Sequence, residues 1–219
     1  MVKNTRQQQR ALERKKKKRN RALENKRTHA QSLGGWPSAE QARWPVMECL
    51  VSGGWANGKS LATIVVARRQ GSRGSVAMAT FLMDLQCLGG KNAFACLLSP
   101  SQYRGTCATA LKYQGPVEIS LDLAAKIVHE GIAYARSLGF EPHPDFARTL
   151  PMLHGAHPEN CTERVPLGGP DGKPLFIQGP DDDAVRILDR LERGVASAEY
   201  GLVVADDFEP DDDLPHASC

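Results

Sequence analysis

Apolar and β-branched residues concentrate in three runs in the first half of the chain, at residues 46–52, 61–69 and 75–88. Such short runs bounded by glycine-rich segments are typical of β-strands. The segment QGSRGS between the second and third runs has the composition of a hairpin turn, and Asn57-Gly58 after the first run is a second hairpin signal. The pattern predicts three antiparallel strands in a β-meander.

Helical spacing replaces this pattern farther along the chain. Apolar residues recur every three or four positions over residues 119–140, where Ser120 is suited to cap the first turn and Gly139 to end the helix. A second amphipathic pattern covers residues 181–195 and starts with three aspartates, which are favourable at the positive N-terminus of a helix. The sequence therefore predicts two main helices.

The remaining segments predict smaller elements. Residues 141–163 are rich in proline and histidine and predict irregular structure, residues 165–180 predict a hairpin that turns at Asp171-Gly172, and the apolar run at 200–205 predicts a last strand. The predicted fold class is α+β, with an antiparallel β-meander, hairpins and the two main helices.

Charge divides the chain into unlike parts. The formal net charge is only +3, yet residues 1–30 contain 12 lysines and arginines against two glutamates, and residues 206–219 contain six acidic residues and no lysine or arginine. The predicted organisation is a basic helical or disordered arm (1–33), a linker (34–45), an α+β globular domain (46–205) and an acidic disordered tail (206–219).

The basic arm predicts a polyanionic partner. Its residues are good helix formers, but the consecutive like charges repel each other until phosphates neutralise them and condensed counterions are released. We expect a non-enzymatic nucleic-acid-associated protein, with RNA favoured over DNA; a protein–protein adaptor with a solubilising arm is an alternative. A further hypothesis is that the acidic tail competes with phosphate for the arm. The residues expected to contact nucleic acid are Arg6, Arg10, Arg14, Lys15, Lys16, Lys17, Lys18, Arg19, Arg21, Lys26 and Arg27.

Residues 53–60, GGWANGKS, match the pattern of a phosphate-binding loop. In that interpretation Gly53, Gly58, Lys59 and Ser60 would hold a magnesium nucleotide, and the protein would be a nucleotide hydrolase. The β-branched run that follows prefers a strand, and no series of parallel strands surrounds the motif. A hairpin turn is therefore the favoured interpretation.

Two metal-based alternatives remain, although no cofactor is favoured. His143, His154, His157 and Cys161 could supply zinc ligands, but solvated loop histidines are the favoured interpretation. A metal-dependent nuclease would need magnesium ligands from separate elements, and the candidates are Glu48, Asp84, Glu118 and Asp122.

Three segments of the chain resemble segments found in a set of uncharacterised bacterial proteins with a basic N-terminal arm. They are FLMDLQCLGGKNAF (81–94), LGFEPHPDF (138–146) and GKPLFIQGPDDD (172–183). The resemblance covers residues 46–205 and implies no activity. Within it, Lys91 and Asn92 are exposed polar candidates for ligand contact, with a plain turn as the favoured interpretation.

The sequence also bears on the compartment. It contains no apolar run near the roughly 20 residues that span a bilayer and no apolar segment typical of a secretory signal. The six cysteines include no C-x-x-C pair, so free and mostly buried thiols are expected. The expected location is the cytoplasm of a bacterium, with no membrane partner.

Overall fold

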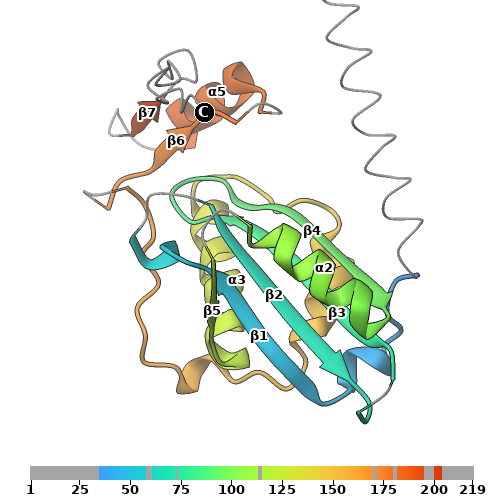
Figure 1. Ribbon diagram of the computed structural model, residues 1–219. Coiled ribbons are helices and arrows are strands. Elements are labelled where there is room, and N and C mark those ends of the chain that lie inside the picture. The colour runs from blue at the N-terminus through green and yellow to red at the C-terminus, as the bar shows by residue number, and fades with distance from the viewer. Residues whose placement is uncertain are drawn as a thin grey trace, which may run out of the picture.

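The computed structural model describes residues 35–57, 61–72, 74–112, 115–169, 172–179, 182–194 and 200–203. Its main feature is a five-stranded antiparallel sheet with the strand order β4-β3-β2-β1-β5. The fold is α+β, as the sequence predicts (Figure 1). The strands of this sheet are β1 (Val46–Ser52), β2 (Ala62–Arg69), β3 (Val76–Asp84), β4 (Gly89–Leu98) and β5 (Pro116–Glu118).

Helices cover both faces of this sheet. Helix α2 lies over one face and α3 over the other, where shorter helical segments also pack (Figure 1). The helices are α2 (Pro100–Ala110), α3 (Leu121–Ser137), α4 (Phe146–Thr149) and α5 (Ala184–Gly194), and the 3₁₀ turns are η1 (Gln41–Arg43), η2 (Trp55–Asn57), η3 (Leu150–Leu153) and η4 (Pro158–Asn160).

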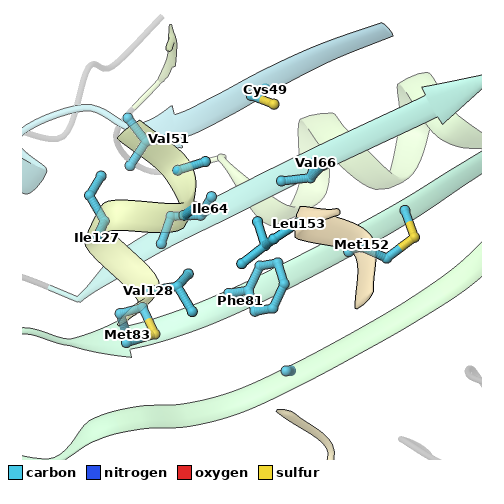
Figure 2. Packing of buried hydrophobic residues seen from close by; sticks show 14 of the residues in the cluster. Cys49, Val51, Ile64, Val66, Phe81, Met83, Ile127, Val128, Met152 and Leu153 are labelled. Carbon is cyan, nitrogen blue, oxygen red and sulfur yellow. The ribbon is translucent and has the colours of Figure 1, made fainter. Parts of the chain in front are cut away.

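The predicted meander is confirmed, and its side chains alternate between the two faces. In β3, Phe81 and Met83 enter the cluster beneath α3, whereas Val76 and Met78 pack beneath α2. Figure 2 shows Phe81 between the helix and the η3 segment, whose Leu153 contributes to the same core. Both faces of the central strands are therefore buried, which explains their nearly continuous apolar composition.

Helix α3 follows the prediction closely. The Ser120 hydroxyl accepts a hydrogen bond from the Leu123 amide at 3.0 Å, and Gly139 has a left-handed φ of 84° just beyond the helix. Gly131 lets the helix approach the sheet, because a Cβ atom there would lie 2.8 Å from the Met83 side chain. The buried face of α3 carries Leu123, Ala124, Ala125, Ile127, Val128, Gly131, Ile132 and Ala135.

Strand β4 and helix α2 are additions to the predicted elements. The glycine pair before Lys91 and Asn92 was expected to form a plain turn, but β4 begins at Gly89 and both polar residues lie within the strand. Helix α2 starts with a capping box between Ser99 and Gln102. Only Tyr103 is buried in this helix, so its apolar periodicity is too weak to reveal it.

The C-terminal hairpin prediction is wrong. Strand β6 (Leu175–Ile177) pairs with β7 (Gly201–Val203), and the two run parallel with α5 between them. The Gly172 amide does donate to the Gly169 carbonyl at 2.9 Å, as in a tight turn, but the chain then enters β6, whose strand partner is β7 and not the segment before the turn. A parallel pair needs a long crossover, and α5 supplies it.

Candidate functional site

A pocket lies between the second half of α3 and the segment 141–150 that follows it. Its volume is about 520 Å³, within the range of small-molecule sites. The polar side chains that line it are His129, Arg136, Glu141 and His143. Apolar side chains, including Ile132 and Phe146, form much of the remaining wall.

The segment that closes the pocket is held against strand β4. The His143 amide donates to the Gly90 carbonyl at 2.9 Å, and the Phe146 ring packs on Phe81 with 5.8 Å between ring centroids. A Cβ atom on Gly90 would lie 2.6 Å from the Phe146 ring and 2.9 Å from Pro142. Glycine at this position therefore allows the segment to lie directly on the strand.

The polar side chains of the pocket keep much of their hydrogen-bonding capacity. Arg136 Nε donates to Glu141 at 3.0 Å, while its two Nη groups make no hydrogen bond to the residues that the structure describes. His143 Nδ1 accepts the Asp145 amide at 3.3 Å and lies 3.6 Å from the Asp145 carboxylate, while its Nε2 makes no hydrogen bond to the described residues. Donors that have no protein partner are the groups a bound anion would use.

A second group of charges is buried where the C-terminal elements meet the sheet. Lys91 Nζ lies 2.7 Å from Asp182 Oδ2, and both side chains are more than four-fifths buried. The same carboxylate accepts the Gly179 amide at 2.8 Å. Lys91 is therefore not the exposed ligand-contacting residue that its sequence context suggested, because it joins β4 to the segment before α5.

Asp84 shapes the turn between β3 and β4. Its carboxylate accepts three main-chain amides, from Gln86 at 2.9 Å, Cys87 at 3.2 Å and Leu88 at 3.2 Å. Burial raises the pKa of Asp84 above its usual range, although these hydrogen bonds and the nearby Lys91 ammonium act against the shift. The role of Asp84 in the described structure is to fix this turn.

The raised pKa predicts a pH-dependent effect of Asp84→Asn. The folded protein holds the Asp84 proton more tightly than the unfolded chain, so the contribution of this group to stability is present below its ordinary pKa and is lost as pH rises through the raised value. Asparagine does not titrate. Urea unfolding at a series of pH values should therefore show the variant gaining stability relative to the parent from about pH 4 toward neutrality.

The control for this measurement is Asp189→Asn, because that side chain is about half exposed on α5. Its difference from the parent measures the general effect of removing one exposed carboxylate. A pH-independent difference between the parent and Asp84→Asn would contradict the assignment of a raised pKa to Asp84.

The structure does not surround GGWANGKS with the elements of a phosphate loop. Gly53 follows β1 and its amide donates to the Gly115 carbonyl at 2.8 Å, whereas Gly58, Lys59 and Ser60 lie outside the described residues. The chain continues into β2, a strand antiparallel to β1, where a phosphate loop requires a helix. The turn is thus the interpretation that agrees with the flanking strands.

The proposed metal ligands do not come together. Within the described parts of the chain, no three histidine, cysteine, aspartate or glutamate side chains are placed to hold a metal ion. His143 pairs with Asp145, His157 pairs with Glu159, and Cys161 Sγ donates to Glu163, so these side chains have separate local partners, and His154 joins none of them. The zinc hypothesis has no assembled site here.

The carboxylates of the nuclease alternative also remain apart. Asp84 caps its turn, and Asp122 accepts the His157 amide at 2.7 Å from the first turn of α3. Glu48 lies in β1 beside a bulge and Glu118 ends β5 on the edge of the sheet. These four side chains therefore form no common magnesium site in the described structure.

The described residues bear on only some of the expectations about the arm, the tail, the cysteines and membrane spans. The nucleic-acid-contacting residues of the arm, Arg6 to Arg27, and the acidic tail lie outside the described residues. Five cysteines in the described ranges are free thiols, of which Cys49, Cys87 and Cys96 are buried. Among the described helices, none has the length and apolar composition needed to cross a bilayer.

Comparisons with protein-family models, curated proteins and solved structures find no match to this chain. Of the polar side chains that line the pocket, sequence reasoning singled out only His143, as a possible zinc ligand, and missed His129, Arg136 and Glu141. Their signal is the spacing of His129 and Arg136, which are seven residues apart and therefore share one exposed face of α3. The partner segment 141–150 lacked a predicted element, so nothing in the sequence placed it opposite that face.

Proposed function

We propose that this protein is a non-enzymatic nucleic-acid-associated protein, with RNA favoured over DNA, and that its basic arm provides the phosphate contacts. The observation that carries the proposal is the segregation of charge. Residues 1–30 hold 12 basic residues against two acidic ones, whereas residues 31–205 hold 16 basic and 17 acidic residues. Affinity for a polyanion is therefore concentrated in one short segment.

The expected binding energy comes largely from counterion release. Each phosphate neutralised by lysine or arginine contributes about −0.7 to −0.9 to the slope of log affinity against log salt. Arginine adds forked hydrogen bonds to phosphate oxygens and can stack on bases. Such contacts need no base-reading motif, in agreement with the absence of a recognisable one from the sequence.

The folded domain supports this proposal over the enzymatic alternatives. A strand follows the GKS motif in place of a helix, and the described carboxylates, histidines and cysteines form no metal-binding group. A nucleotide hydrolase or a metal-dependent nuclease therefore has no assembled centre in the described residues. The adaptor alternative differs from the proposal in one measurable property, because a solubilising arm gives no salt-dependent affinity for nucleic acid.

The test is a salt titration of binding to single-stranded RNA and DNA of the same sequence, from about 50 to 200 mM salt. Replacing Arg14, Arg19, Arg21 and Arg27 with glutamine in the full chain should weaken binding more than about tenfold at the lower salt concentration. The slope should also flatten by about 3, since four phosphate contacts are lost. Lys59→Ala should change neither quantity.

The matched control removes the same charge from the folded domain. Arg43, Arg104, Arg164 and Arg186 are exposed, and replacing these four with glutamine should leave the slope nearly unchanged. Equal losses in the two quadruple variants would assign binding to net charge and not to the arm. If neither variant changes the binding, or if the parent chain does not bind, the proposal is wrong and the adaptor interpretation is favoured.

A further inference from the structure

The pocket between α3 and residues 141–150 combines an apolar wall with a charged rim. Ile132, Phe146 and Leu150 belong to the wall, and a volume of about 520 Å³ is sufficient for one nucleotide-sized molecule. Phe146 rests on Phe81 and is only 1% exposed, so it forms the buried back of the wall. The apolar surface open to a ligand comes from Pro142, Ala147 and Leu150. These side chains can pack against an apolar part of a ligand.

The rim offers hydrogen-bond donors that have no protein partner in the described structure. Arg136 keeps both Nη groups without a partner among the described residues, and His143 Nε2 makes no hydrogen bond to them. The His129 ring likewise makes no hydrogen bond within the described ranges. Two carboxylates face these groups, because Glu141 binds Arg136 Nε at 3.0 Å and Asp145 Oδ2 lies 3.6 Å from His143 Nδ1. The unpartnered Nη groups of Arg136 are therefore the part of the rim best suited to a negatively charged group on the ligand.

The ion pair of Arg136 with Glu141 is easily exchanged for a ligand. Their side chains are 56% and 71% exposed, and an exposed pair of this kind contributes little to stability. A phosphate can bind the guanidinium through two parallel hydrogen bonds, and the displaced Glu141 carboxylate would be solvated. Glu141 thus competes with an anionic ligand for the same guanidinium.

We propose that this pocket binds one nucleotide, with its phosphate at Arg136 and His143 and its base against the accessible apolar side chains of Pro142, Ala147 and Leu150. Choosing a nucleotide among ring-bearing anions rests on the proposed function, in which the arm brings nucleic acid to the domain. The shared chemistry is a nucleoside monophosphate. Its source is either a free nucleotide or the phosphorylated end of a bound strand.

The experiment is calorimetric titration of the full chain with adenosine monophosphate, uridine monophosphate, adenosine and inorganic phosphate. Both monophosphates should bind saturably, and the nucleoside and inorganic phosphate should bind at least about tenfold more weakly, since each lacks one half of the recognised group. Equal affinity for inorganic phosphate and the monophosphates would overturn the role of the apolar wall.

Three variants assign the site. Arg136→Gln should weaken monophosphate binding about tenfold or more, whereas Glu141→Gln should strengthen it by a few-fold, because the competing carboxylate is gone. Arg148→Gln is the matched control: this arginine lies on the same segment but stacks on Trp36 at 4.2 Å and does not line the pocket. A merely structural effect of the Arg136 substitution would not be accompanied by a gain in Glu141→Gln. Identical affinities in the Arg136 and Arg148 variants would overturn the proposal.

A competition experiment distinguishes a free nucleotide from a phosphorylated strand end as the ligand. The quadruple arginine variant of the arm distinguishes failure of the pocket proposal from failure of the proposed function. A 5′-phosphorylated oligonucleotide that displaces the bound monophosphate identifies the strand end as a ligand, and lack of displacement identifies the free nucleotide; both keep the pocket as a nucleotide site. The quadruple arginine variant of the arm should still bind the monophosphates. Saturable monophosphate binding without salt-dependent binding of a strand would support the pocket proposal and contradict the proposed role of the arm. Salt-dependent strand binding without monophosphate binding would contradict the pocket proposal alone.

Discussion

Replacing Arg68 with methionine is expected to lower the free energy of unfolding by about 3–5 kcal/mol. Arg68 is 3% exposed in β2 and makes no ion pair with a described carboxylate. Its Nε donates to the Met152 carbonyl at 2.8 Å and its Nη1 to the Trp44 carbonyl at 2.9 Å. The remaining Nη2 donates to the His154 carbonyl. Methionine would leave three main-chain carbonyls without these donors.

The consequence should reach beyond β2, because Arg68 connects two segments that are distant in sequence. Trp44 follows η1, while Met152 and His154 belong to the η3 segment that covers the sheet beside α3. Urea unfolding of Arg68→Met and Arg68→Lys would measure the loss of unfolding free energy. Arg68→Lys should recover only part of the stability, since one ammonium group cannot reach three diverging carbonyls with the geometry of a guanidinium.

The neighbouring arginine provides the control. Arg69 is partly exposed, and its side chain makes no hydrogen bond to the described residues, so Arg69→Met should change the free energy of unfolding by no more than about 0.5 kcal/mol. Similar losses in Arg68→Met and Arg69→Met would contradict the role assigned to Arg68.

The sequence predicts the parts of this fold that local pattern controls. The first three strands show as apolar runs between turn residues, and α3 shows through its spacing, the Ser120 cap and the Gly139 end. Helix α2 lacks an apolar stripe, and the signal that could have revealed it is the capping sequence Ser99-Pro100 with Gln102 three residues after the cap. Parallel pairing of β6 with β7 depends on contacts across α5, which a local pattern does not contain.

Side-chain roles were harder to predict than elements, for the same reason. Arg68 resembles any arginine at the end of a strand, and only the fold reveals three carbonyls around it. His129 and Arg136 resemble a solvated helix face until residues 141–150 are placed opposite. Conversely, the GKS motif in isolation matches a phosphate-binding loop, but the antiparallel pairing of the strands that flank it favours a turn. Tertiary neighbours decide these functions, and a single sequence does not specify them.

The fold constrains Gly89 in two ways, through its backbone conformation and through its close contact with α3, and the sequence alone shows neither. It starts β4 with a φ of 66°, in the left-handed region that favours glycine. A Cβ atom at this position would also lie 2.5 Å from the Ala135 Cβ and 2.9 Å from the Gly131 carbonyl oxygen. The backbone of β4 therefore touches α3 at the point where the helix itself carries a glycine.

Gly89→Ala is accordingly expected to destabilise the protein by about 2–5 kcal/mol, the sum of a left-handed alanine and an overpacked contact with α3. Gly71→Ala is the matched control, because Gly71 has a φ of 70° and nothing within 4 Å of its added Cβ atom. That variant should lose only about 1 kcal/mol. The difference between the two losses in urea unfolding measures the contact with α3 alone. Equal losses would mean that α3 moves away from β4 at little cost, and that the close approach of helix and strand does not limit this position.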